Sequence, residues 1–124
     1  MFIDLDEFKS VNDARGHDVG DRVLQMVAQR LQTVVRGGDT VSRRSGDEFL
    51  VLTAEAKDDA SVAAFAARIV DNIGAACNID GARVTVKASI GITTYPEDGR
   101  SPEELLKKAD RAMYTDKRRK TQAP

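Results

Sequence analysis

The apolar residues of this chain switch repeatedly between the spacing of a β-strand and the spacing of an α-helix. Residues 1–5 form an apolar run, and residues 84–92 alternate between apolar and polar side chains, as a strand with one buried face does. Apolar residues recur every three or four positions over 19–35, 62–73 and 105–113, which predicts three amphipathic helices. The short segments 40–45 and 48–54 flank a small polar stretch, so we expect a hairpin there. Strands interleaved with helices predict a sheet covered by helices, of the α/β or α+β class.

Length and composition exclude several classes of protein. The 124 residues are enough for one domain but not for two. Nineteen Lys and Arg against 20 Asp and Glu give a net charge of -1, which argues against nonspecific nucleic-acid binding. No apolar stretch approaches the roughly 20 residues that span a bilayer, and no signal-peptide pattern opens the chain, so we expect no membrane contact and a cytoplasmic location. The single Cys77, in what we interpret as a helical stretch, permits no internal disulfide.

Acidic side chains stand at the end of the first expected strand and in the expected hairpin turn. Asp4 and Asp6 lie where the apolar run becomes polar, and Asp47 and Glu48 lie in the hairpin. If the hairpin pairs beside the first strand, these carboxylates meet, and oxygen ligands without His or Cys favour Mg²⁺. An equally good interpretation is that Asp4 and Asp6 cap a short helix and that the hairpin acids form a polar turn.

The polar segment that follows the first strand carries residues suited to a nucleotide. Lys9 could contact a phosphate. Asn12 with Asp21 offers the donor and acceptor groups that can recognise the edge of a guanine base. We interpret His17, in a loop beside a glycine, as structural, because it has no evident nucleophile as a partner.

Arg36 and Asp39 enclose two glycines just after the first long helix. An arginine can form paired hydrogen bonds to a guanine edge or a phosphate, and an aspartate can accept from the guanine N1–H and N2–H₂ groups. The pair could therefore hold a second guanine ligand. Taken alone, it is better explained as a helix C-terminus followed by an ordinary turn.

Together, and in this order, these segments resemble the GGDEF family, the diguanylate cyclase domains that condense two GTP molecules into cyclic di-GMP. The resemblance covers nearly the whole chain. The segments that carry it are Asp4-Leu5-Asp6-Glu7-Phe8-Lys9, Asn12-Asp13, Gly16-His17-Asp18-Val19-Gly20-Asp21, Arg36-Gly37-Gly38-Asp39, Arg43-Arg44-Ser45-Gly46-Asp47-Glu48-Phe49, Ser89-Ile90-Gly91, and Ala109-Asp110-Arg111-Ala112-Met113-Tyr114 with Lys117.

The resemblance implies an α+β fold of the palm type, related to class III nucleotide cyclases. Its central, mainly antiparallel sheet would be flanked by helices, with the signature hairpin at the active site. Residues 1–124 would form a single domain that lacks the family's usual N-terminal helix and turn, and that belongs to a larger signalling protein.

The resemblance also assigns roles to individual residues. Asp4 and Asp47, with the backbone carbonyl of Leu5, would bind Mg²⁺ or Mn²⁺. Glu48 would support the metal site or catalysis alongside Asp47. The substrate-binding residues would be Phe8, Lys9, Asn12, Asp21, Gly46 and Lys117, with the lysines on the triphosphate and Asn12 and Asp21 on the guanine.

The implied reaction needs two copies of the chain. In a homodimer, each copy presents one GTP, and each 3′-hydroxyl attacks the α-phosphate of the other GTP. Arg36 and Asp39 match the family's inhibitory site, so the product, cyclic di-GMP, would inhibit synthesis there.

Two further departures from the family pattern bear on activity, and the first of them, Ser45, supports an alternative. Ser45 occupies the first glycine position of the signature, and a Cβ would cost about 1 kcal/mol if the backbone there is left-handed. The usual Gly-Arg-Asn after the last helix is replaced by Lys120-Thr121-Gln122, which removes a phosphate contact that Arg118, Arg119 or Lys120 could replace. The alternative is an inactive module that binds GTP or cyclic di-GMP as a sensor; a purely structural domain is a third possibility.

Overall fold

Four antiparallel strands form the central sheet of the computed structural model, which describes residues 1–122. They are β1 (Phe2–Asp6), β2 (Thr40–Ser45), β3 (Glu48–Leu52) and β6 (Lys87–Gly91), in the spatial order β2-β3-β1-β6. The helices are α1 (Phe8–Arg15), α2 (His17–Val34), α3 (Asp59–Gly74) and α4 (Pro102–Gln122). A separate small hairpin pairs β4 (Cys77–Ile79) with β5 (Ala82–Val84). The predicted α+β class with a mainly antiparallel sheet is confirmed.

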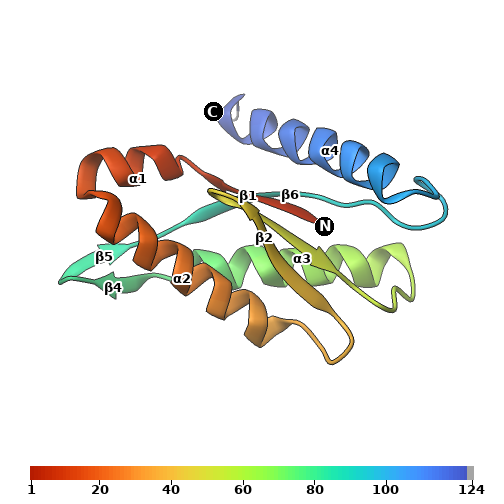
Figure 1. The fold of residues 1–124 in the computed structure, drawn as a ribbon, viewed down its shortest axis with the longest axis horizontal. Helices are drawn as coiled ribbons and strands as arrows, with labels where there is room; N and C mark the ends of the chain where they lie inside the picture. Colours follow the sequence, from red (N-terminus) through yellow and green to blue (C-terminus); the bar gives the residue numbers. More distant parts are fainter. Residues whose placement is uncertain (123–124) are drawn as a thin grey trace.

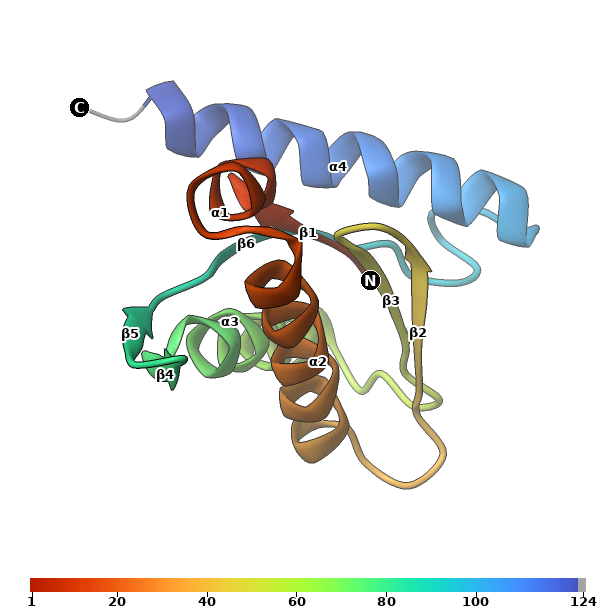
Figure 2. The ribbon, with the colours of Figure 1, turned by 60° about the vertical axis from the view of Figure 1, so that its left-hand side comes forward.

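Helices cover both faces of the sheet (Figures 1 and 2), with α2 and α3 on one face and α4 across the other. Successive side chains of β1 point to opposite faces of the sheet, so each face packs against a different set of helices. Ile3 and Leu5, both fully buried, point toward α2 and α3, whereas Phe2 packs against Ala109 and Met113 of α4.

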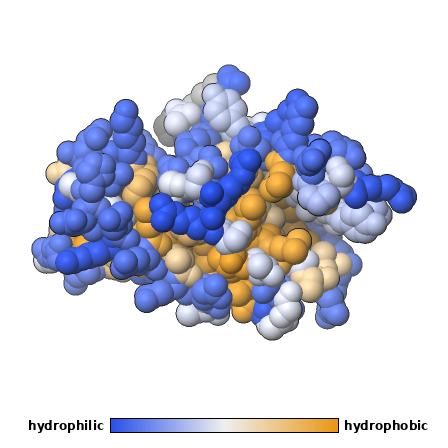
Figure 3. All heavy atoms as spheres, viewed as in Figure 1, coloured by the Kyte–Doolittle hydropathy of each residue, from blue (hydrophilic) through white to orange (hydrophobic). Residues whose placement is uncertain are grey.

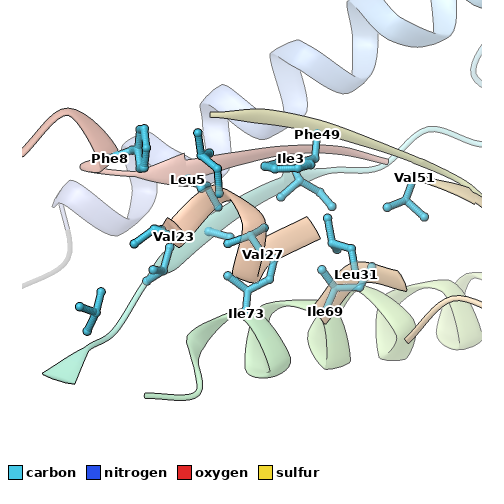
Figure 4. Close-up of a cluster of buried hydrophobic side chains, with 14 of the residues drawn as sticks. Ile3, Leu5, Phe8, Val23, Val27, Leu31, Phe49, Val51, Ile69 and Ile73 are labelled. Carbon is cyan, nitrogen blue, oxygen red and sulfur yellow. The ribbon is translucent and has the colours of Figure 1, made fainter. Parts of the chain in front are cut away.

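The larger core lies between the sheet and the α2–α3 layer (Figure 4). One stripe of α2 contributes Val23, Val27 and Leu31, which are completely buried. Ile69 and Ile73 lie on the facing stripe of α3 and are equally buried. Each such side chain contributes about 1.5–3 kcal/mol of transfer free energy, so this aliphatic layer holds the strand that carries the acidic residues.

Helix α4 is held against β6 by close packing and by a hydrogen bond. A Cβ on Gly91 would collide with the backbone of Ala109 and Met113, so the helix approaches the strand as closely as a glycine permits. The Asp116 carboxylate accepts a hydrogen bond from the Ile90 backbone N–H at 3.1 Å. At its start, α4 has the expected cap: Ser101 Oγ accepts from the Glu104 N–H at 3.2 Å.

Several local predictions were wrong. Residues 8–15 form the short helix α1, anchored through the buried Phe8, but its N-cap is Glu7 and not Asp4 or Asp6. Cys77 lies in strand β4 and not in a helix. The last strand of the sheet begins at Lys87, because Val84 belongs to the β4–β5 hairpin. The last helix, predicted over 105–113, extends over Pro102–Gln122.

Figure 3 shows hydrophobic residues gathered in the middle of one face, with hydrophilic residues around them. Large apolar side chains that are exposed include Leu52, Tyr95 and Tyr114. Within residues 1–122, no helix is both long and apolar enough to cross a membrane.

Candidate active site at the β1–β3 edge

The hairpin of β2 and β3 pairs directly beside β1 and brings acidic residues of the two segments together. Asp4 lies opposite Glu48 in the strand register. The Leu5 N–H donates to the Asp47 carbonyl at 3.1 Å, so the hairpin turn is tied to the end of β1. The expectation that the hairpin pairs beside the first strand is confirmed.

Asp4 is largely enclosed. Its side chain is 14% exposed, and its Oδ1 atom is buried. Burial and the nearby charge of Asp47 raise the pKa of Asp4 above its ordinary value, with a smaller contribution from Glu48, and Lys117 opposes them. A buried carboxylate near other acidic side chains favours a neighbouring cation.

Lys117 of α4 supplies the cation in this structure. Its Nζ lies 3.2 Å from Asp4 Oδ1 and 3.8 Å from Asp6 Oδ1. Asp6 is further engaged by Ser89, whose Oγ donates to Asp6 Oδ1 at 2.8 Å. Asp6 thus shares Lys117 with Asp4 and is held by β6, whereas Asp47 and Glu48 are the acids whose charges act on Asp4.

The donor set suits a divalent cation bound jointly with a ligand. Across residues 1–122, no three His, Cys, Asp or Glu side chains converge closely enough to form a metal site alone. Mg²⁺ commonly takes one or two carboxylates and completes its shell with backbone oxygens, water and substrate phosphates. Asp4, with its buried Oδ1, and the neighbouring Asp47 fit that mode of binding.

The hairpin turn accommodates the unusual serine without backbone strain. Ser45 lies in β2, and its φ is not in the left-handed region, whereas Gly46 has φ 38°. The Arg43 Nε donates to the Gly46 carbonyl at 2.8 Å, which closes the turn. The Ser45 hydroxyl lies 3.2 Å from Glu48 Oε2 and donates to it. Gly46, not Ser45, therefore needs the glycine's conformational freedom.

Helices α1 and α2 carry the residues expected to contact a nucleotide. Lys9 and Asp21 are exposed, and Asn12 is half-buried where α1 packs on α2. Phe8 is 8% exposed, belongs to the core and anchors α1. His17 is the first residue of α2 and not a loop residue.

Arg36 and Asp39 lie before β2, whereas Ser45 and the signature lie at its other end (Figure 1). The Asp39 carboxylate accepts hydrogen bonds from the Arg36 N–H at 3.0 Å and from the Ala54 N–H at 3.1 Å. It therefore holds its own turn, as the simpler interpretation expected, while the Arg36 side chain is exposed.

Sequence reasoning missed the role of Asp116 and the position of Lys120. The Lys120 ammonium contacts the Ala88 carbonyl and lies 3.6 Å from Asp116 Oδ2 and 3.8 Å from Asp6 Oδ2. In this structure the Lys120 ammonium is therefore directed toward the edge strand β6 and these acids, and not toward open solvent where a phosphate could bind it. The four-residue spacing of Asp116 and Lys120 was the available signal for this pair.

A palm-like sheet with a carboxylate-lined hairpin at one edge defines a domain of the nucleotide-cyclase type. The family model described as "Diguanylate cyclase, GGDEF domain" matches residues 1–123. The chain therefore belongs to the GGDEF family, as its sequence motifs indicated.

Individual proteins give the same result. The bifunctional diguanylate cyclase/cyclic di-GMP phosphodiesterase MucR of Pseudomonas aeruginosa is 47% identical over 114 residues, 92% of this chain and 16% of MucR. The cyclic di-GMP phosphodiesterase NbdA of the same organism is 41% identical over 117 residues, 94% of this chain and 15% of NbdA. The chain thus spans about one sixth of the length of these relatives.

A third relative has a solved structure. Diguanylate cyclase TpbB of Pseudomonas aeruginosa is 44% identical over 123 residues, 95% of this chain and 27% of TpbB. The crystal structure of its GGDEF domain superposes with a TM-score of 0.91 at 42% identity and covers 95% of this chain and 74% of that one.

Proposed function

We propose that this chain is a diguanylate cyclase domain, which condenses two GTP molecules into cyclic di-GMP and two pyrophosphates. The observation that carries the proposal is the buried Asp4 oxygen beside the signature hairpin, which lies 3.2 Å from the Lys117 ammonium of α4. Membership of the GGDEF family, and similarity to a relative named as a diguanylate cyclase, support the same activity. We take residues 1–124 as one catalytic domain.

Asp4, Asp47 and the Leu5 carbonyl would hold Mg²⁺ or Mn²⁺ in this domain. A divalent cation bound there would activate the attacking hydroxyl and neutralise the charge that develops on the phosphates. Glu48, opposite Asp4 in the register, supports this acidic site together with Asp47.

The remaining residues bind and orient GTP. Lys117 contacts Asp4 and can exchange this carboxylate for a phosphate oxygen of GTP. The exposed Lys9 is the second phosphate contact. Asn12 and Asp21, on adjoining helices, recognise the guanine edge. Gly46, in the left-handed region, lets the hairpin backbone approach the phosphates.

One copy of the domain supplies half of the reaction centre. In a homodimer, the 3′-oxygen of one GTP forms a bond to the α-phosphorus of the other, the bond from that phosphorus to pyrophosphate breaks, and the hydroxyl proton passes to solvent. The same exchange in the opposite direction closes the ring. The domain's contribution is to hold both GTP molecules in line.

Arg36 and Asp39 form the inhibitory site for cyclic di-GMP in this proposal. The exposed Arg36 side chain is free to stack on or hydrogen-bond to a guanine of the product. Asp39 accepts hydrogen bonds from two backbone N–H groups, which fixes the turn and holds Arg36 near the N-terminal end of β2.

Ser45 favours one alternative, a module that binds GTP or cyclic di-GMP without turnover. Its hydroxyl holds Glu48, an interaction that a glycine could not make. The similarity to NbdA, named as a phosphodiesterase, shows that domains like this one also occur in proteins not named as cyclases.

The test is mass-spectrometric detection of cyclic di-GMP after incubating concentrated protein with GTP and Mg²⁺. We expect product from the wild type and none from Asp47→Ala, which excludes a contaminating cyclase. Binding of guanine nucleotides by folded wild-type protein without any product would favour the sensor. Product from Asp47→Ala at the wild-type rate would refute the metal assignment.

A further inference from the structure

Gly20, in the first turns of α2, is buried beneath the side chain of Asn12. A Cβ built on Gly20 would lie 2.9 Å from Asn12 Cγ, closer still to Asn12 Oδ1, and 3.3 Å from Phe8 Cζ. Two carbon atoms in contact are normally about 3.5–4.0 Å apart. The Asn12 amide therefore occupies the space that any other residue at position 20 would fill.

Within residues 1–122, no hydrogen bond fixes the Asn12 amide. Among the hydrogen bonds of residues 1–122, none involves its side chain, although its backbone carbonyl accepts from the Gly16 N–H at 2.8 Å. The position of the amide is set by packing against Gly20, and its donor and acceptor groups remain available to a ligand.

The contact also sets the relation between Asn12 and Asp21. Asp21 follows Gly20 directly and is exposed, so the amide lies against the backbone next to the aspartate. Guanine presents the O6 acceptor beside the N1–H and N2–H₂ donors, whereas adenine presents a donor amine beside a ring acceptor. An amide and a carboxylate held side by side match the guanine pattern.

We propose that Gly20 is a positioning residue for guanine recognition: its lack of a side chain lets Asn12 lie beside Asp21, and this arrangement determines selectivity for guanine over adenine nucleotides. This inference rests on the proposed function, because it assigns the base-recognising residues of the same GTP site.

Gly20→Ala is a clean test, because it moves a flexible side chain and not the fold. The atoms nearest to the new Cβ are at the end of the Asn12 side chain, and alanine favours a helix more than glycine does. We expect the melting temperature to stay the same or rise, while the amide moves away from its place beside Asp21.

The experiment measures binding of the non-hydrolysable α,β-methylene analogues of GTP and ATP, with Mg²⁺, by titration calorimetry. The wild type should prefer the guanine analogue, and Gly20→Ala should lower that preference about tenfold, with little change for the adenine analogue. Gly74→Ala, at the end of α3, is the matched control, since its Cβ would meet only an ordinary contact at 3.5 Å, and it should leave the preference unchanged.

A double-mutant cycle separates positioning from a general loss of structure. Gly20→Ala should add nothing when Asn12 is already alanine. Unchanged guanine preference in Gly20→Ala, or a further tenfold loss in the Asn12→Ala background, would overturn the inference. If the folded wild-type protein binds neither analogue, the proposed function is refuted. This outcome differs from a refutation of the role of Gly20, in which the wild type still prefers the guanine analogue.

Discussion

The ammonium group of Lys117 lies 3.2 Å from the buried Oδ1 atom of Asp4. The C-terminal helix thus delivers a positive charge to the end of β1, where Asp47 and Glu48 add negative charge. Lys117 is 31% exposed and can move. In the proposed reaction, Lys117 leaves Asp4 and binds the triphosphate of GTP. The Asp4 carboxylate can then bind a divalent cation.

Lys117→Met should therefore weaken binding of GTP. Hydrogen bonds to charged groups contribute about 1.5–3 kcal/mol, so we expect at least a tenfold loss of affinity for a non-hydrolysable GTP analogue, measured by calorimetry. Lys108→Met, an exposed lysine on the same helix, should leave the affinity unchanged. Equal affinity in both variants would remove Lys117 from the phosphate site.

Asp116 should make stability depend on pH in the acidic range. Burial alone would raise the pKa of Asp116, but hydrogen bonds from Arg119 and the Ile90 N–H, with the charge of Lys120, hold it below its ordinary 3.8. A carboxyl whose folded-state pKa is lowered stabilises the fold above its unfolded pKa, and that stability is lost as pH falls through the folded value.

Asp116→Asn should accordingly lower the free energy of unfolding by about 1 kcal/mol at pH 7, and the deficit should shrink below about pH 4. Urea unfolding at several pH values measures this. The exposed Asp110→Asn on the same helix is the control. A deficit that stays constant down to pH 2 would show that the Asp116 charge plays no part.

Gly91→Ala should separate α4 from the sheet. The new Cβ would lie 2.9 Å from the Ala109 carbonyl carbon and closer to two other backbone atoms of α4, so the helix itself must shift. We expect a loss of about 3 kcal/mol in urea unfolding, at the upper end of ordinary overpacking costs. Gly37→Ala, with nothing within 4 Å of its Cβ, should change stability by less than about 0.5 kcal/mol. Comparable losses in the two variants would contradict this account of the packing.

The long helices and strands could be predicted from the sequence because their apolar residues recur with a clear period. Elements of only a few residues were missed because they are too short to show a period. Strands β4 and β5 have three residues each, too few for an alternating pattern. Their turn, Asp80-Gly81, has φ of 52° and 80°, and this Asp-Gly pair was the hairpin signal that could have placed Cys77 in a strand.

For the site, the meeting of Asp4 with Asp47 and Glu48 followed from the hairpin and from family motifs. What no local pattern could supply were contacts between distant segments. Ser89 and Asp6 are 83 positions apart, and their contact depends on the pairing of β1 with β6. Lys120 and Ala88 are 32 positions apart, and their contact depends on how α4 crosses the sheet. The side chain of Asn12 on Gly20 likewise depends on the packing of two helices.

Arg36→Ala should separate inhibition from synthesis. The backbone N–H of Arg36, which Asp39 accepts, survives this substitution, so the turn keeps its shape. We expect cyclic di-GMP to bind at least tenfold more weakly while initial synthesis rates stay within about twofold, since an arginine–guanine pair contributes about 1–3 kcal/mol. Asp39→Ala is a poorer test, because it also removes the acceptor of two backbone N–H groups. Full product inhibition in Arg36→Ala would place the inhibitory site elsewhere.

Ser45→Gly should leave catalysis nearly unchanged. The backbone of Ser45 is not in the left-handed region, so a glycine there would relieve no strain. The Ser45 hydroxyl makes one exposed hydrogen bond to Glu48 at 3.2 Å, and such a bond is of modest strength. We expect kcat for cyclic di-GMP synthesis to change by less than about threefold, which corresponds to about 0.7 kcal/mol in the barrier. Ser45→Ala keeps the Cβ but removes the hydroxyl, and should behave in the same way. A large gain in Ser45→Gly alone would show that the Cβ obstructs substrate, and a gain in both variants would show that the hydroxyl restrains Glu48.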